Sequence, residues 1–185
     1  MTGSGSFKSE LKEVLTEKDD EKKQFLVHYM GYRQPDQFTM KKNDQENFQV
    51  SVNMDIEKVP EFRAGSKMFI NPRMYQFNNT TVPSTENRKL DFYFYHPYIE
   101  SDTTYYILPD GFTVENLPKP RMLAFEYGAF NSNYVFDEKL NRITSTATLI
   151  LKQNRIPASK FAETKKFYSD VLEEYSDKIV VKQKM

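Results

Sequence analysis

Three side chains near the middle of the sequence could perform chemistry together: His96, Glu100 and Asp102. An imidazole beside two carboxylates can hold a metal ion or transfer protons as a general acid and base. The alternative is that these side chains are solvated residues of a loop between two strands, which Pro97 makes rigid. We favour the loop, because charged residues are the ordinary content of exposed loops.

Other patterns that usually accompany catalysis or cofactor binding are missing from the sequence. The chain has no Cys, which excludes a thiol nucleophile, a disulfide framework and any Cys-ligated metal site. Its two histidines, His28 and His96, are too far apart for a metal motif of paired histidines. No glycine-rich phosphate loop and no G-x-S-x-G nucleophile turn occurs. The sequence therefore predicts that this chain is not an enzyme and that it carries no cofactor or metal.

The aromatic residues are a second candidate source of function, since the chain contains 12 Tyr and 15 Phe but no Trp. Tyr93, Tyr95 and Tyr105 lie in strand-like segments and could form an exposed platform that stacks on a glycan or a peptide. Alternatively, each tyrosine packs half-buried in a sheet with its hydroxyl group in water. We favour packing and keep the three tyrosines as candidate ligand-binding residues.

Charge and hydropathy argue against two classes of partner. Lys plus Arg equals Asp plus Glu at 26 each, so the chain lacks the basic excess of a nucleic-acid-binding protein. No apolar stretch approaches the roughly 18 residues that a membrane-spanning helix needs. Residues 1–6 have neither the basic start nor the apolar core of a signal peptide. We therefore expect either a cytoplasmic protein or an internal piece whose targeting signal lies upstream.

Two short helices are expected at residues 7–31. Phe7 and Leu11 belong to a first apolar stripe with helical spacing, and a second stripe follows an interruption near Thr16. Acidic residues follow Thr16, which is the pattern of an N-cap for the second helix, and Gly31 is a suitable C-terminal stop.

Beyond residue 31 the apolar pattern becomes alternating, which indicates strands with one solvated face. A helical pattern at 161–175 follows Pro157 and precedes a final strand at 179–181, which we expect to pair at a sheet edge. The polar segment 72–89 is expected to be a long exposed loop. The strand-like segments are 48–56, 67–70, 90–94, 103–108, 112–117, 122–125, 129–136 and 142–151.

Together these elements predict a mainly β fold. The expected architecture is an antiparallel immunoglobulin-like β-sandwich from about 36 to 152, with an N-terminal helical pair and one helix before the last strand. Residues 1–31 are interpreted as an interdomain link and helical lead-in, and residues 32–185 as the sandwich domain.

An ordered set of short motifs gives the sequence a family resemblance. The motifs are HPYIESDT at 96–103, LPDGF at 108–112, ENLPKP at 115–120, FEYG at 125–128, RIPA at 155–158 and KIVV at 178–181. The set resembles the C-terminal domain of unknown function that follows a transglutaminase-like domain in multidomain proteins of Bacteroides-type bacteria. The Asn/Thr-rich loop 76–85 has no counterpart in this resemblance.

The resemblance implies an accessory role. In such proteins the catalytic Cys, His and Asp belong to the upstream transglutaminase-like domain, and this chain has no Cys to take such a role. The implied partner is that upstream domain, and the implied location is the periplasm or the cell surface. Phe7 and Leu11 are then the expected interdomain contacts, on an exposed patch that could also drive dimerisation. An independent glycan- or peptide-binding module is the alternative function.

Overall fold

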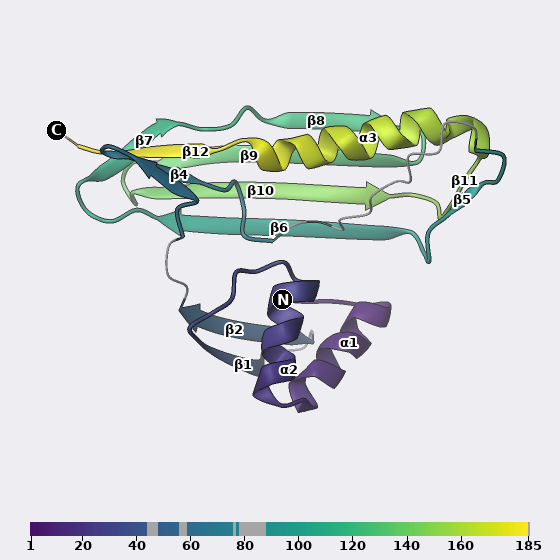
Figure 1. The fold of residues 1–185 in the computed structure, drawn as a ribbon, viewed down its shortest axis with the longest axis horizontal. Helices are drawn as coiled ribbons and strands as arrows, with labels where there is room; N and C mark the ends of the chain where they lie inside the picture. The colour runs from purple at the N-terminus through teal and green to yellow at the C-terminus, as the bar shows by residue number, and fades with distance from the viewer. Residues whose placement is uncertain (44–47, 56–58, 76, 78–87, 185) are drawn as a thin grey trace. The chain divides into compact units, whose positions relative to one another are not determined.

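The computed structural model describes residues 1–43, 48–55, 59–75, 77 and 88–184, and the chain divides into two compact units, Met1–Val59 and Pro60–Met185 (Figure 1). Within the described residues the fold is mainly β, as predicted, with twelve strands in antiparallel sheets and three α-helices. The first two strands belong to the same compact unit as the N-terminal helices.

The N-terminal unit begins with α1 (Gly5–Thr16), α2 (Asp19–Gln24) and the π-helical turn η1 (Phe25–Tyr29). The predicted interruption near Thr16 is confirmed, but its predicted role as an N-cap is wrong. The Thr16 hydroxyl donates back to the carbonyl of Glu13 at 2.7 Å, and Lys18 occupies the N-cap position of α2. Gly31 follows the helical segment with a φ of 70°, which fits its predicted role as the stop.

The same unit contains a two-stranded antiparallel sheet of β1 (Gln37–Asn43) and β2 (Gln49–Asp55). An isolated bridge joins Thr2 to Gln49, and the Val50 N–H donates to the carbonyl of Met1 at 2.8 Å. Met1 and Thr2, at the start of the segment interpreted as an interdomain link and lead-in, are therefore bonded to β2.

A four-stranded antiparallel sheet with the strand order β6-β10-β9-β8 forms the centre of the C-terminal unit; we call it the long sheet. Its strands are β6 (Tyr98–Ile107), β8 (Arg121–Phe125), β9 (Gly128–Asp137) and β10 (Arg142–Leu151). A tight loop joins β9 to β10, with Asp137 accepting backbone N–H groups and Asn141 at a φ of 45°. β6 begins earlier than predicted, so Glu100 and Asp102 lie in a strand and not in a loop.

A second four-stranded sheet has the order β3-β4-β12-β7. Its strands are β3 (Phe62–Ala64), β4 (Lys67–Ile70), β7 (Phe112–Asn116) and β12 (Ile179–Gln183). The prediction that the last strand pairs at a sheet edge is wrong, because β12 lies between β4 and β7 and bonds to both. A short pair joins β5 (Phe92–Tyr93) to β11 (Arg155–Ile156).

The predicted helix before the last strand is confirmed as α3 (Phe161–Glu173), with the 3-10 turns η2 (Ala158–Lys160) before it and η3 (Glu174–Ser176) after it. In Figure 1, α3 and β12 follow one another across one face of the long sheet, which we call the inner face. Toward one end of this face, Ile143 packs in a cluster with Ile70 and Val181 of the second sheet. Toward the other end, Phe130 packs with Phe167 of α3. The second layer is therefore half sheet and half helix, and the expected immunoglobulin-like sandwich is not confirmed.

The predicted exposed loop at 72–89 is only partly described. Its first part is buried, since Arg73 is 2% exposed and Phe77 is 1% exposed, so this part of the prediction is wrong. Residues 76 and 78–87, which include most of the Asn/Thr-rich loop, lie outside the described residues. No helix in the described part of the chain combines the length and the apolar character needed to cross a membrane.

Candidate functional site

The candidate acid–base residues do not converge in the structure. Glu100 and Asp102 lie on the inner face of β6, where Tyr75 donates to Glu100 at 3.3 Å and Thr104 donates to Asp102 at 2.8 Å. His96 is exposed before β6 begins, with its Nδ1 3.1 Å from the carbonyl oxygen of the next residue. Among the residues that the structure describes, no group of three His, Cys, Asp or Glu side chains could hold a metal ion.

The three candidate tyrosines are exposed but do not form one platform. Tyr93 on β5 is 64% exposed and Tyr95 is fully exposed. Tyr105 lies seven residues after Tyr98, the first residue of β6, which is about 23 Å along a strand at about 3.3 Å per residue. Its ring faces the guanidinium of Arg142, 4.9 Å from the ring centroid. Tyr105 therefore belongs to a different surface from Tyr93 and Tyr95.

The two candidate interdomain residues differ in exposure. Leu11 is fully buried, and its helix α1 contacts α2 and β1 of its own unit. Phe7 is half-buried and stacks on Tyr29 with 6.5 Å between the ring centroids. Leu11 therefore contributes nothing to an exposed patch, whereas part of Phe7 is accessible.

A buried ion pair lies where the helical and sheet halves of the second layer meet. Arg73 follows β4, Glu174 follows α3, and neither side chain has any exposed area. The guanidinium donates to both carboxylate oxygens, at 2.5 and 2.7 Å, and Tyr134 also donates to Glu174. Burial lowers the pKa of Arg73, but the hydrogen bond and charge of Glu174 outweigh it and raise that pKa above its usual value. The enclosed network suits a structural role, since it offers no accessible group to a ligand.

Asp102 gives a testable pH dependence of stability. Burial raises the pKa of its carboxyl, against the opposing effects of the Thr104 hydrogen bond and the Arg73 charge. A raised folded-state pKa favours folding while Asp102 is protonated, and this contribution is lost as the pH rises through the folded-state pKa. We expect Asp102→Asn to raise the unfolding temperature slightly at about pH 7, as measured by thermal denaturation. At about pH 3 this increase in unfolding temperature should vanish. An equal increase at both pH values would contradict a raised pKa of Asp102.

The other face of the long sheet, which we call the outer face, carries side chains aligned in rows. In an antiparallel sheet, directly opposed residues of neighbouring strands point to the same side. From one end toward the other, the four consecutive rows are Tyr105–Thr144–Val135, Thr103–Thr146–Asn133, Ser101–Thr148–Asn131–Met122 and Ile99–Ile150–Ala129–Ala124. Three of these side chains are large, apolar and solvent-exposed, since Ile99, Met122 and Val135 are 71%, 85% and 52% exposed.

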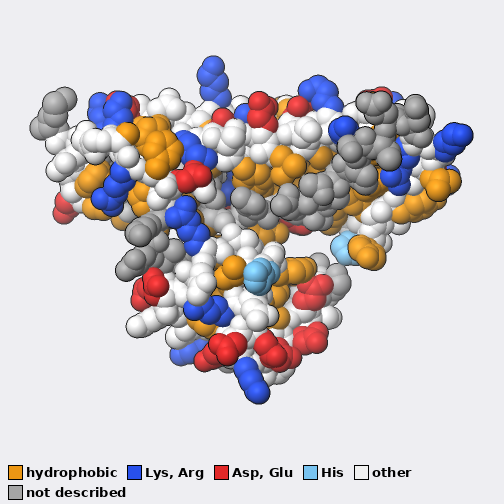
Figure 2. Space-filling view, in the orientation of Figure 1, with side chains coloured by type: hydrophobic (Ala, Val, Ile, Leu, Met, Phe, Trp, Pro, Cys, Tyr) orange, Lys and Arg blue, Asp and Glu red, His pale blue; other side chains and the backbone are white. Residues whose placement is uncertain are grey.

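No side chain in these four rows is charged, although 28% of the chain is Asp, Glu, Lys or Arg. Charge appears in the adjoining row, where Arg142 lies between Ile107 and Asp137. Figure 2, seen from the side that carries α3, shows Lys, Arg, Asp and Glu side chains spread over that side. Surfaces that only meet water carry mixed charges, whereas the centres of interfaces are depleted of charge. The outer face therefore has the composition of a contact surface.

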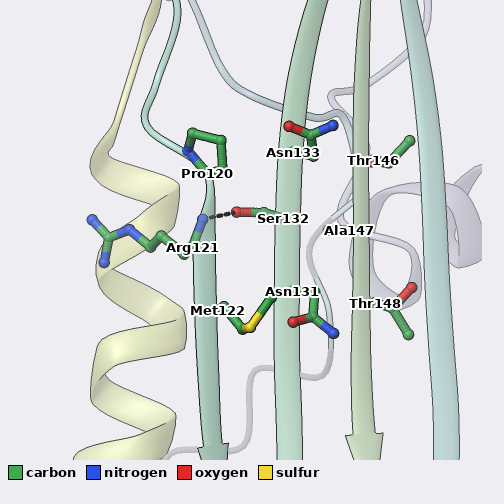
Figure 3. A pocket seen from close by; sticks show the side chains of 9 residues that line it. All are labelled: Pro120, Arg121, Met122, Asn131, Ser132, Asn133, Thr146, Ala147 and Thr148. Atoms are coloured by element: carbon green, nitrogen blue, oxygen red, sulfur yellow. Dashed lines mark hydrogen bonds between the residues drawn. The ribbon is translucent and has the colours of Figure 1, made fainter.

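A shallow groove of about 350 Å³ crosses β8, β9 and β10 on the outer face. Figure 3 shows the Asn and Thr side chains of β9 and β10 along this groove. Arg121 directs its guanidinium away toward α3, where it bonds to Glu173 at 3.2 Å and Asp177 at 3.0 Å. The groove thus offers neutral hydroxyl and amide groups beside the apolar Met122 side chain.

Neither the outer face nor the ion pair was predicted from the sequence. A signal for the outer face was present, because segments 128–136 and 143–151 contain no charged residue in a chain otherwise rich in charge. The ion pair joins residues 101 positions apart, and no local pattern indicates such a pair.

Two comparisons relate the chain to known proteins. The family described as Domain of Unknown Function with solved-structure structure (DUF3858) matches residues 66–181. A crystal structure of a protein from Parabacteroides distasonis ATCC 8503, described as a "putative protease", is similar with 10% sequence identity and a TM-score of 0.47. That match covers 56% of this chain and 20% of the other, so it spans about a fifth of that protein. No curated protein matches the chain.

Proposed function

The chain belongs to the DUF3858 family, and we propose that it is a non-catalytic accessory domain that binds another folded domain of its parent protein through the outer face of the long sheet. The observation that carries this proposal is the set of four uncharged rows on that face. These rows combine exposed apolar side chains with hydroxyl and amide groups, as the centre of a protein interface does.

The dimensions of the outer face fit such a contact. The four rows hold 14 residues, and with strands about 4.8 Å apart and rows about 6.7 Å apart these residues cover roughly 450 Å². Interfaces between domains of one chain bury roughly 600–1,500 Å² in total, so each side contributes about half of that area. The uncharged part of the outer face is thus large enough to form one side of an interdomain contact.

The partner that we propose is a transglutaminase-like catalytic domain, because the motif set of this chain resembles the domain that follows such an enzyme. In this proposal catalysis belongs entirely to the partner, and the absence of Cys from this chain is consistent with that division. Export of the parent protein to the periplasm or the cell surface is part of the same proposal.

The central test introduces a charge in the middle of the outer face. Thr146 lies on β10, between Thr103 and Asn133. We expect the separately produced upstream domain to bind this chain, and Thr146→Lys to weaken that binding at least about 30-fold, because an unpaired ammonium buried in an interface costs about 2 kcal/mol or more. Isothermal titration calorimetry measures both affinities.

Ser169→Lys is the matched control, because Ser169 is exposed on α3, away from the outer face. Its binding should equal that of the unchanged chain. No association at about 100 µM, or equal binding by both Lys variants, would contradict the proposal. Binding of a neutral glycan without binding of the upstream domain would favour the alternative of an independent binding module.

The exposure of Tyr93 and Tyr95 is the observation that favours this alternative. A glycan site on these tyrosines would be insensitive to Thr146→Lys and sensitive to Tyr95→Ala. Thr146→Lys and Tyr95→Ala therefore distinguish the two candidate functions.

A further inference from the structure

Among the strands that the structure describes, β6 lies at one edge of the long sheet. The strand order ends at β6, and among the described residues no strand pairs with its far side. The strand is ten residues long, pairs with β10 without a register shift and contains no Lys, Arg or Pro. Edge strands of natural proteins are commonly protected by Lys, by Pro, by bulges or by short length. β6 has none of these four protections. Its two charged side chains, Glu100 and Asp102, point to the inner face, and inward-pointing charges also protect edges, so pairing through β6 requires a register that keeps these carboxylates apart.

The backbone groups that face outward from this edge can be identified. The Leu108 N–H donates to the carbonyl of Asn141 at 2.9 Å, which continues the β6–β10 register by one residue. Backbone groups of alternate residues in a strand point to opposite sides. The even-numbered residues of β6 therefore bond to β10. The odd-numbered residues, from Ile99 to Ile107, direct their N–H and C=O groups outward.

We propose that two copies of this chain pair through β6 in an antiparallel arrangement, with a two-fold axis at Thr103, to form one continuous eight-stranded sheet. This assembly goes beyond the proposed function, because it uses the edge of the long sheet and leaves the outer face of both copies on the same open side. The partner in this inference is a second copy of this chain.

The register about Thr103 uses every outward-facing residue of the strand. Thr103 pairs with Thr103 of the second copy, Ser101 pairs with Tyr105, and Ile99 pairs with Ile107. Each such pair exchanges two backbone hydrogen bonds. The pairing also places Ile99 and Ile107, which are 71% and 77% exposed, beside each other at both ends of the joint. Cross-strand apolar pairs of this kind stabilise sheets.

Charge on the inner face disfavours two of the alternative registers. With the axis at Thr103, Asp102 lies opposite Thr104 and Glu100 lies opposite Tyr106, so no carboxylate opposes another carboxylate. With the axis at Asp102, the two Asp102 carboxylates would oppose each other. With the axis at Ser101, Glu100 would oppose Asp102. Like charges directly opposite one another destabilise a sheet, so the registers about Asp102 and Ser101 are less favourable than the register about Thr103.

Sedimentation velocity on the full chain tests the assembly. Edge pairing buries less area than a standard interface, so we expect a dimer with a dissociation constant on the order of 10–100 µM. Thr103→Pro should weaken the dimer at least tenfold, because proline removes an outward N–H at the axis. The same variant should keep the fold, because the Thr103 N–H does not bond to β10. Thr104→Pro, which removes an inward N–H, should instead lower the unfolding temperature.

A disulfide tests the register without relying on proline. The chain has no Cys, so Thr103→Cys introduces a unique thiol on the axis, where opposed Cα atoms are about 5.5 Å apart and within disulfide range. Oxidation should link Thr103→Cys into a covalent dimer. Ser101→Cys should form little covalent dimer, because its two thiols would lie about 13 Å apart along the paired strands.

Three outcomes would overturn the inference: a monomer at 500 µM, a dimer unaffected by Thr103→Pro, or equal disulfide formation by Thr103→Cys and Ser101→Cys. Thr146→Lys separates this inference from the proposed function, since that change should leave the dimer intact. A dimer lost in Thr146→Lys and kept in Thr103→Pro would assign self-association to the outer face and reject pairing through β6.

Discussion

Glu174→Gln is expected to destabilise the C-terminal unit by about 3–5 kcal/mol, because it leaves the Arg73 guanidinium buried without its counter-charge. Both side chains are fully enclosed, and the carboxylate accepts hydrogen bonds from Arg73 and Tyr134. The amide keeps the size of the carboxylate. The loss of unfolding free energy therefore measures the removal of the charge and its hydrogen bonds, and not the creation of a cavity. Thermal denaturation should show a fall of roughly 10 °C or more in the unfolding temperature of this unit.

A double replacement is the control for this result. Arg73→Met combined with Glu174→Leu removes both charges and keeps much of the buried volume, and such replacements of a buried ion pair are often neutral or stabilising. We therefore expect the double variant to be more stable than Glu174→Gln alone. A Glu174→Gln variant within about 0.5 kcal/mol of the unchanged chain would show that the ion pair does not hold the second layer.

Phe130→Ala is expected to destabilise the same unit by about 3–5 kcal/mol, the usual loss for a buried Phe replaced by Ala. Phe130 is fully buried on the inner face, in one cluster with Phe167 and Tyr168 of α3. Its ring also meets the edge of Phe77, with 6.2 Å between the ring centroids. The substitution leaves a cavity between the long sheet and α3. Denaturant unfolding measures the resulting decrease in unfolding free energy.

Val135→Ala is the matched control on the same strand. Val135 lies on the outer face of β9 and is 52% exposed, so its truncation should change stability by no more than about 0.5 kcal/mol. The two substitutions together test whether the two faces of the long sheet contribute differently to stability. The inner face should determine stability, whereas changes on the outer face should affect binding more than folding. Equal losses in both variants would contradict this division.

Local pattern was sufficient to predict most of the elements. The stripes on either side of Thr16, the helical pattern at 161–175 and the strand-like segment at 142–151 predict helices and a strand that the structure contains. These predictions succeed because helix and strand periods, caps and turn residues depend on neighbours in sequence. The mainly β class and the helix before the last strand follow from the same short-range information.

The sequence also limited the chemistry that this chain can do. Without Cys it can supply no thiol nucleophile, and with two distant histidines it offers no paired-histidine metal motif. The local pattern could not show whether polar side chains that are close in sequence lie on the same side of a strand. His96 and Asp102 do not form a metal-binding group, because His96 precedes β6 whereas the Asp102 side chain lies on the strand's inner face.

Only the tertiary structure showed which side chains share a face of the sheet and which strand lies at its edge. The position of β12 between β4 and β7, the contact of Arg73 with Glu174 and the alignment of Thr103, Thr146 and Asn133 in one row all depend on strand order and register. Strand order and register are fixed by contacts between residues far apart in sequence, which no local period records. The uncharged outer face and the open edge of β6 are therefore properties of the assembled sheet, although each strand that builds them can be read in the sequence.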